Sequence, residues 1–263
     1  MSNSQTSFLR RYIPPAAWNI ARDSYYRLRL LRFWRAWLSG LIFDLFVRQY
    51  RADGMKFSVP VALMKRAHRA RFLHDTHERE ERNMVKQWLP KNSTVLELGA
   101  CLGVVSCVIN RCLSNPRLQV AIEPNLQLLE VLKANRDMNS CGFAIENCLV
   151  SRASDGSFYL NDAIVMSSAD QKGAKEIKVP VQTVEQLQMR HAMIFDAVFM
   201  DIQGGELGFM KENSELLARC HCVILEFHPH IIGEGSCEEC RELLRSAGLG
   251  LKEKCGLVEA WLR

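Results

Sequence analysis

Acidic side chains and one histidine stand where apolar segments of this sequence end. Such segments alternate with amphipathic ones, which predicts the strands and helices of a mainly parallel sheet whose strand ends meet at one edge. The polar residues in question are Glu97, Glu123, Asn147, Asp201, Glu206, Glu226 and His228. Carboxylates gathered in one crevice repel each other unless a cation or hydrogen-bond donors lie among them. The residue types therefore predict a site that recognises a cationic ligand and can move a proton.

A glycine-bearing turn at residues 94–103 indicates the class of ligand. A β-branched, apolar strand leads through Gly99 and Gly103 into an apolar helix, and such turns bind nucleotide-like groups with helix-start amides. Cys101 stands where the dinucleotide pattern G-x-G-x-x-G needs its second glycine, and a phosphate-binding lysine is missing from the turn. Glu123, twenty residues after Gly103, is placed to accept both hydroxyls of a ribose. An adenosine that carries a cationic group, such as S-adenosylmethionine, satisfies these features.

Composition and charge are those of a folded protein with a basic N-terminal segment. The 263 residues are 48% hydrophobic and 24% charged, with a net charge of +5. Residues 1–51 hold nine arginines and two acids, which gives 9 − 2 = +7 and leaves 5 − 7 = −2 for the rest. The main body is near neutral, so we expect no nucleic-acid partner. Ten cysteines scattered through predicted strands and helices, without a secretory signal, favour reduced thiols and a cytoplasmic location.

Three regions are expected along the chain. Residues 1–51 form a basic helical extension, 52–93 a connecting strand and helix, and 94–263 the α/β domain with helices on both faces of its sheet. The charged helical stretch at 65–89 is read as a solvated helix face, with a metal cluster of its histidines as the alternative. Residues 161–175 are expected to form a loop.

The N-terminal extension has two interpretations. Its apolar residues Leu31, Trp34, Leu38, Leu41 and Leu45 fall on one helix face, with arginines roughly opposite. The helix that carries these residues has a longest uncharged stretch of eight residues, 36–43, which is too short to span a bilayer, since that needs about 20. The helix either packs on the domain as a cap, or residues 22–48 contact the inner face of an anionic membrane peripherally.

Several strings of the sequence resemble one family. Residues 94–103 with 121–125 look like motif I and the following motif of class I methyltransferases. Residues 135–139, 150–156, 201–206 and 226–229 are similar to the FkbM family, so that the match runs from about Glu78 to Phe227. The resemblance implies a Rossmann-like, seven-stranded methyltransferase that uses S-adenosylmethionine, usually to methylate a sugar or natural-product hydroxyl. Glu97 and Cys101 depart from the family's usual Asp-x-Gly-Ala-Asn/His, and His77-Glu78 replaces a common Tyr-Glu.

On this basis the cofactor residues receive roles. Gly99 and Gly103 are expected to let the backbone approach the methionine part, and Glu97 to order the turn through backbone amides. Asn147 either contacts the adenine edge or is a turn residue. Glu78 and Glu80 are weaker candidates for binding the methionine ammonium.

Catalysis is expected to depend on the later strand ends. Asp201 is the best-placed general base, and His228 has the side chain most suited to proton transfer near neutrality. Glu206 and Glu226 complete either a proton relay or a divalent cation site. The expected activity is O-methylation of a sugar, glycan or hydroxylated metabolite. The alternatives are N-methylation of a small molecule or protein, and a cofactor-binding but inactive interaction module.

Overall fold

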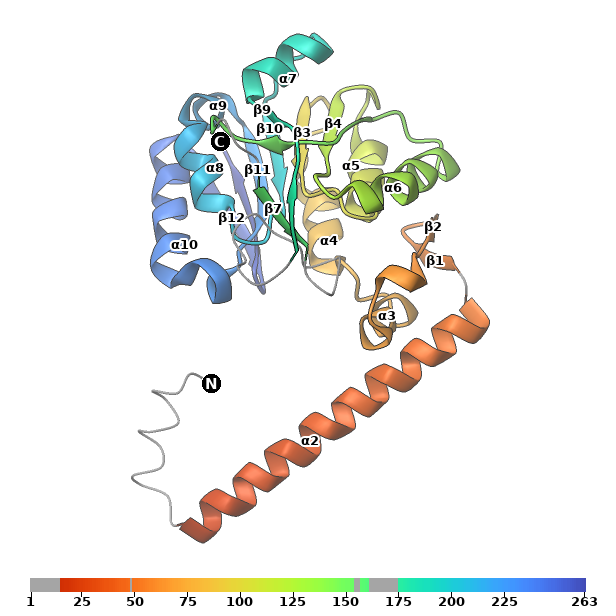
Figure 1. Ribbon diagram of the computed structural model, residues 1–263. Coiled ribbons are helices and arrows are strands. Elements are labelled where there is room, and N and C mark those ends of the chain that lie inside the picture. The colour runs from red at the N-terminus through yellow and green to blue at the C-terminus, as the bar shows by residue number, and fades with distance from the viewer. Residues whose placement is uncertain (1–14, 48, 154–156, 161–174) are drawn as a thin grey trace.

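Seven strands form the central sheet of the computed structural model, which describes residues 15–47, 49–153, 157–160 and 175–263. Their order across the sheet is β12 (Gly250–Cys255), β13 (Val258–Leu262), β11 (Cys222–Glu226), β10 (Ala197–Met200), β3 (Val95–Leu98), β4 (Gln119–Ile122) and β5 (Ala144–Glu146) (Figure 1). Strands β11, β10, β3, β4 and β5 run parallel, and β13 is antiparallel to both β11 and β12. The prediction of a Rossmann-like, mainly parallel seven-stranded sheet is confirmed.

Helices cover both faces of this sheet, as its near-continuous apolar strands require. One face packs against α4 (Arg79–Trp88), α5 (Val104–Cys112) and α6 (Leu126–Met138). The other packs against α7 (Val184–His191), α8 (Glu206–Glu212), α9 (Ser214–Arg219) and α10 (Pro229–Ser246). The period-two alternation of a strand divides each segment between the two layers: Val95 lies in the first core, and Leu96 and Leu98 in the second.

A hairpin of β1 (Gln49–Ala52) and β2 (Met55–Ser58) is fixed to α6 by two buried asparagines. Asn135 accepts from the Ser58 amide at 2.7 Å and donates to the carbonyls of Ser58 (3.1 Å) and Leu102 (2.8 Å). Asn139 bonds the amide and carbonyl of Lys56 in the same way. The two asparagine side chains thus bind the backbone of β2 as a neighbouring strand would. The expected boundary between residues 51 and 52 falls inside this hairpin.

Two predicted helices are interrupted. The stretch at 65–89 divides into α3 (Arg66–Leu73) and α4, because Asp75 and Glu78 between them adopt left-handed φ values of 49°. The sequence pattern at 207–218 also predicts one helix, and the structure divides this stretch at Asn213 into α8 and α9. A single long helix was therefore wrong in both places. Of the predicted loop at 161–175, residues 161–174 lie outside the described part of the chain.

The remaining short elements flank this framework. A parallel pair joins β6 (Leu149–Val150) to β9 (Val181–Gln182), and an antiparallel pair joins β7 (Ser157–Leu160) to β8 (Lys175–Lys178). The 3₁₀ turn η2 (Val61–Leu63) leads into α3. All ten cysteines are free thiols.

The N-terminal helix α2 (Pro15–Ile42) continues into a π-helical turn, η1 (Phe43–Val47), and reaches well beyond the domain (Figure 1). Its C-terminal part rests on α3, where Phe43 is fully buried and its ring lies 5.8 Å from that of Phe72. No helix in the described ranges is both long and apolar enough to cross a membrane.

Candidate functional site

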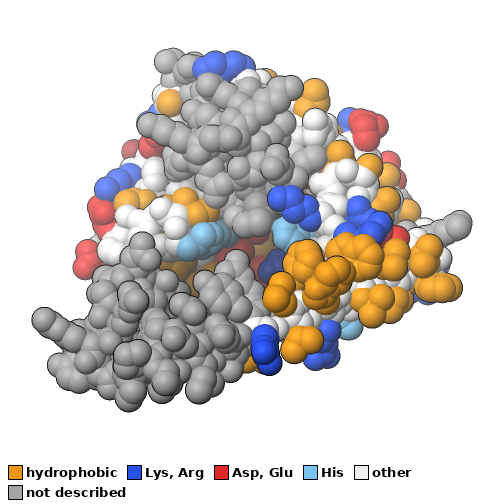
Figure 2. Space-filling model, turned by 60° about the horizontal axis from the view of Figure 1, so that its bottom comes forward, with side chains coloured by type: hydrophobic (Ala, Val, Ile, Leu, Met, Phe, Trp, Pro, Cys, Tyr) orange, Lys and Arg blue, Asp and Glu red, His pale blue; other side chains and the backbone are white. Residues whose placement is uncertain are grey.

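A cavity of about 640 Å³ opens at the carboxyl ends of β3, β4, β10 and β11. This is where open α/β sheets bind ligands, and the volume is in the usual range for small-molecule sites. The segment around α3 and the start of α4 forms the opposite wall, with Phe72, His77 and Glu78 among the lining residues. Figure 2 shows histidine and acidic side chains in a hollow beside the helix that carries a band of hydrophobic side chains.

The floor of the cavity lies at the point where the chain changes direction across the sheet. From β3 the chain proceeds outward to β4 and β5, and it then returns to β10 on the other side of β3. At this switch point Gly99 has a φ of +88°, and a Cβ on it would lie 1.9 Å from the carbonyl oxygen of Asp201. Only glycine permits this approach, which brings the turn after β3 against the catalytic candidate Asp201.

Glu123 holds the turn at the end of β4. It is buried at the cavity wall and accepts from the backbone amides of Cys101 (2.8 Å) and Asn125 (2.7 Å). Cys101 itself adopts a left-handed φ of 50° beside the cavity. Burial raises the pKa of Glu123 to about 7, despite these hydrogen bonds, which lower it. The two amides fix the Glu123 carboxylate at the cavity wall.

His228 lies among three carboxylates at the ends of β10 and β11. Its Nδ1 is 2.7 Å from Glu206 Oε1, and its Nε2 is 3.5 Å from Asp201 Oδ1 and 3.4 Å from Glu226 Oε2. Burial by itself lowers the pKa of His228, but its hydrogen bonds to Glu206 and Glu226 raise it to about 10. The ring is therefore a cation at neutral pH. Burial and the nearby Glu226 raise the pKa of Asp201 to about 7.

The start of α4 contributes a second acidic group. Glu78 and Glu81 both line the cavity, and Glu81 Oε2 is buried without a hydrogen-bond partner. Burial raises the pKa of Glu78 well above its usual range and that of Glu81 to about 7. The neighbouring His77 has its pKa lowered to about 3 by burial, so it offers these acids no positive charge.

The cavity is thus strongly acidic. Seven carboxylate side chains line it: Glu78, Glu80, Glu81, Glu123, Asp201, Glu212 and Glu226. Ionising several of them together in a buried space is unfavourable unless a positive charge is present. A cationic ligand of nucleoside size meets this need. The donor set of the cavity therefore fits S-adenosylmethionine, which carries a sulfonium and an ammonium group.

Several residues assigned to the cofactor from the sequence do not reach the cavity. Glu97 is a fully buried residue of β3, and its carboxylate accepts from Ser106 Oγ (2.7 Å) and Gln119 Nε2 (2.8 Å) rather than from the expected backbone amides. Gly103 precedes α5 with a φ of +79°, and a Cβ there would lie 2.5 Å from Leu132 Cδ1. Packing against α6 thus accounts for this glycine.

The other two candidates differ in position. The side-chain amide of Asn147 donates to the carbonyls of Glu123 and Pro124, which is the turn role of its two alternatives. Glu80 lines the cavity but is exposed to solvent.

The reading of 65–89 as a solvated face was wrong at the start of α4. His77, Glu81 and Arg82 are buried there. Arg82 donates to Asp75 at 2.8 Å and contacts Asp53, which ties α4 to the β1–β2 hairpin. A signal was present, because Glu81 shares a helical face with the apolar Met84, Val85 and Trp88. An acidic residue within an apolar helix face indicates a buried carboxyl group with a functional role.

One group of side chains in the described ranges has the arrangement of a metal site. Asp201, Glu226 and His228 each offer a ligand atom, and these atoms all lie within 4.8 Å of one another. Glu206 contacts the other nitrogen of His228, as outer carboxylates do in many histidine-ligated metal sites.

Comparison with known proteins gives one family. The sequence matches the model described as the methyltransferase FkbM domain over residues 97–251. No curated protein matches the chain.

Three solved structures with a similar chain trace show the range of the likeness, all at low sequence identity. A precorrin-6y C5,15-methyltransferase from Geobacter metallireducens is 13% identical, with a TM-score of 0.46 over 70% of this chain and 88% of that one. A putative SAM-dependent methyltransferase from Streptococcus mutans is 10% identical, with a TM-score of 0.46 over 81% of this chain and 55% of that one. Aeropyrum pernix fibrillarin, crystallised with S-adenosyl-L-methionine, is 9% identical, with a TM-score of 0.42 over 70% and 74% of the two chains.

Proposed function

This chain belongs to the FkbM family of methyltransferases, whose model covers more than half of it, and we propose that it methylates oxygen. The methyl group comes from S-adenosylmethionine, and the acceptor is a hydroxyl of a sugar, a glycan or a hydroxylated metabolite. The observation that carries the proposal is the position of Asp201, an ionisable carboxylate beside the glycine turn and at the cavity wall.

Binding of the cofactor rests on the acidic walls. The Glu123 carboxylate accepts hydrogen bonds from the ribose hydroxyls. The backbone amides of Cys101 and Asn125 orient its two oxygens. Glu78 and Glu81 face the cavity without a counter-charge from the neutral His77, which supports them as partners for the methionine ammonium. When bound, the sulfonium supplies an electrophilic methyl carbon.

Methyl transfer to oxygen needs a proton acceptor. The hydroxyl oxygen forms a bond to the methyl carbon, the carbon–sulfur bond breaks with its electron pair going to sulfur, and the hydroxyl proton goes to a base. We propose Asp201 as this base, because its pKa of about 7 leaves much of it ionised near neutrality. His228, already protonated, orients the Asp201 and Glu226 carboxylates instead of accepting the proton.

A divalent cation is the alternative way to satisfy the same carboxylates. Asp201, Glu226 and His228 would supply two oxygens and one nitrogen at the wall of the cavity, with the cation displacing the proton that His228 otherwise holds between the carboxylates. A cation there would bind the acceptor hydroxyl and favour its ionised form. Metal content of the purified protein, and activity after chelation and readdition of Mg²⁺ or Mn²⁺, distinguish this arrangement from the metal-free one.

Two alternative functions of the cavity predict different effects of losing the Asp201 carboxylate. An amine acceptor needs a base less than a hydroxyl does, so N-methylation would tolerate loss of the Asp201 carboxylate. An inactive cofactor-binding module would bind S-adenosylmethionine and release no product with any acceptor.

The decisive experiment is an acceptor screen with methyl-labelled S-adenosylmethionine, with and without chelator. We expect Asp201→Asn to bind the cofactor normally in calorimetry and to lose roughly 10²-fold or more in turnover on a hydroxyl acceptor. Asp137→Asn is the matched control, because this aspartate is exposed on α6. Undiminished turnover of Asp201→Asn on a hydroxyl acceptor would contradict the assignment.

A further inference from the structure

The N-terminal helix presents its apolar face to solvent, and we propose that this face docks on the surface of an anionic membrane. The apolar face consists of Leu31, Trp34, Leu38 and Leu45, whose exposed fractions are 60%, 60%, 53% and 60%. Phe46 extends it at 79% exposure. Figure 2 shows hydrophobic side chains gathered along the described part of α2, at the lower right of the view.

The domain does not cover this face because α2 uses its other face to pack. Gly40 lies so close to α3 that a Cβ would be 1.9 Å from the Arg66 carbonyl oxygen. Phe43 is fully buried, and Ser39 Oγ lies 3.0 Å from His74 Nε2. At 100° per residue, Ser39 and Gly40 lie on a different side of α2 from the line of Leu31, Trp34 and Leu38. The contact with α3 therefore fixes the apolar face outward.

The positive charges next to the apolar face indicate that its partner is anionic. Arg27, Arg32 and Arg35 are exposed on α2, and the described side chains from residue 27 to the end of the helix include no acid. Asp44, in the following turn, is already paired with Arg66 and Arg69. Phosphate headgroups complement such a surface, with arginine stems lying along the apolar face and their guanidinium groups at the lipid phosphates.

A second copy of the chain fits the same face less well. It would bring the arginines of two cationic helices together, whereas a membrane supplies anions and an apolar layer at once. The orientation is parallel to the surface, since none of the described helices is apolar enough to span a bilayer.

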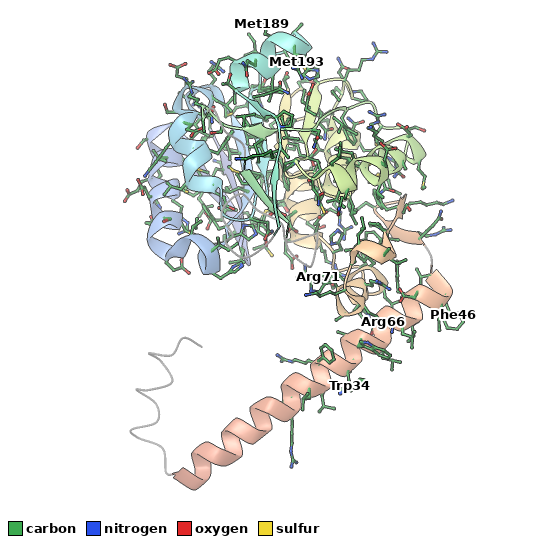
Figure 3. All side chains as sticks on the ribbon, viewed as in Figure 1. Trp34, Phe46, Arg66, Arg71, Met189 and Met193 are labelled. Atoms are coloured by element: carbon green, nitrogen blue, oxygen red, sulfur yellow. The ribbon has the colours of Figure 1, made fainter. Side chains whose placement is uncertain are left out.

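Docking in this orientation has a consequence for the cavity. The helix α3 contacts α2 and the following turn η1 on one side and lines the cavity on the other, and Phe72 both packs against Phe43 of η1 and lines the cavity. Arg71, which also lines the cavity, lies on the side of the domain that faces α2 (Figure 3). An acceptor attached to a lipid would reach the cavity from this side, a point that rests on the proposed methyl transfer.

Vesicle flotation of the full-length protein tests the docking without reference to activity. We expect the protein to float with vesicles that contain phosphatidylglycerol, and far less with pure phosphatidylcholine or at high salt. The variant Leu31→Ser/Trp34→Ser/Leu38→Ser should lower partitioning by about 10-fold or more. The variant Arg27→Gln/Arg32→Gln/Arg35→Gln should lower it by about 100-fold at low salt.

The matched control removes exposed apolar side chains elsewhere. Met189 and Ile194 are 83% and 70% exposed, and Met189 lies at the opposite end of the molecule from α2 (Figure 3). Met189→Ser/Ile194→Ser should float like the wild type, and thermal melting verifies that each variant is folded. Equal flotation of the wild type and the Leu31/Trp34/Leu38 variant would overturn the proposal. So would a wild-type dimer that does not float and that this variant converts to a monomer, since the occupant would then be a second copy.

Discussion

Replacing Glu97 by glutamine tests whether this buried acid has a structural role or binds the cofactor. Burial raises the pKa of Glu97 from 4.5 to about 7, and its neighbours Ser106 and Gln119 are neutral. An acid whose pKa is raised by folding destabilises the protein at high pH. The loss is recovered as pH falls through the folded pKa, because the folded state then binds a proton that the unfolded state does not.

The size of the effect follows from these two pKa values. Between about pH 8 and pH 6, a group with a folded pKa of about 7 and an unfolded pKa of 4.5 contributes about 1 kcal/mol of added stability. For a chain of this size that is a rise of roughly 2–4 °C in Tm. Glu97→Gln cannot bind this proton, so its stability should rise less on acidification, by that amount.

Calorimetric melting of both proteins over this pH range measures the difference. Glu81 and Asp201 titrate in the same range in both proteins, and the Glu97 charge is the smallest of the causes that raise the pKa of Glu123, so the difference reports mainly Glu97. Glu130→Gln is the control, because Glu130 is an exposed side chain on α6. Parallel pH profiles of the wild type and Glu97→Gln would refute the reasoning. Glu97→Gln should also bind S-adenosylmethionine within about threefold of the wild type, and a much larger loss would restore the contact expected from the sequence.

Two further predictions concern the cavity. Because Glu123 must be ionised to accept ribose hydroxyls and has a pKa of about 7, its contribution should make cofactor affinity fall roughly tenfold from about pH 8 to pH 6, and calorimetry of Glu123→Gln should show a flatter profile. An unchanged slope in that variant would assign the pH dependence to other carboxylates. Gly99→Ala should lower stability by about 3 kcal/mol or more, because its Cβ would overlap the Asp201 carbonyl at a positive φ, and denaturant unfolding measures this. A near-neutral Gly99→Ala would show that the two strand ends can separate.

The sheet and its strand-end residues could be predicted because they depend on local pattern. Strands that are apolar throughout, each ending in a carboxylate, specify both a buried parallel sheet and the edge where Glu123 and Asp201 meet. The reason for each glycine could not be predicted in this way. The glycine spacing suggested approach to a ligand, whereas Gly103 is required by packing on Leu132, which a sequence pattern does not contain.

Residues whose positions depend on tertiary contacts could not be predicted either, because a local sequence pattern does not contain those contacts. Arg82 is buried because it meets Asp53 and Asp75 from separate segments, so a charged stretch that resembles a solvated helix contains a buried ion pair. The direction of the apolar face of α2 likewise depends on Gly40, a single residue whose contact with α3 no helical periodicity reveals.

The clamp of Asn135 and Asn139 on β2 also determines when parts of the chain can assemble. Asn135 lies 77 residues after the Ser58 amide that it binds. At synthesis rates of about 5–20 residues per second, the hairpin waits roughly 4–15 s for its partner to leave the ribosome. During that interval the hairpin of β1 and β2 is already made, but the asparagines that bind its backbone are not. The backbone groups of Lys56 and Ser58 are therefore open to other contacts until α6 has been translated.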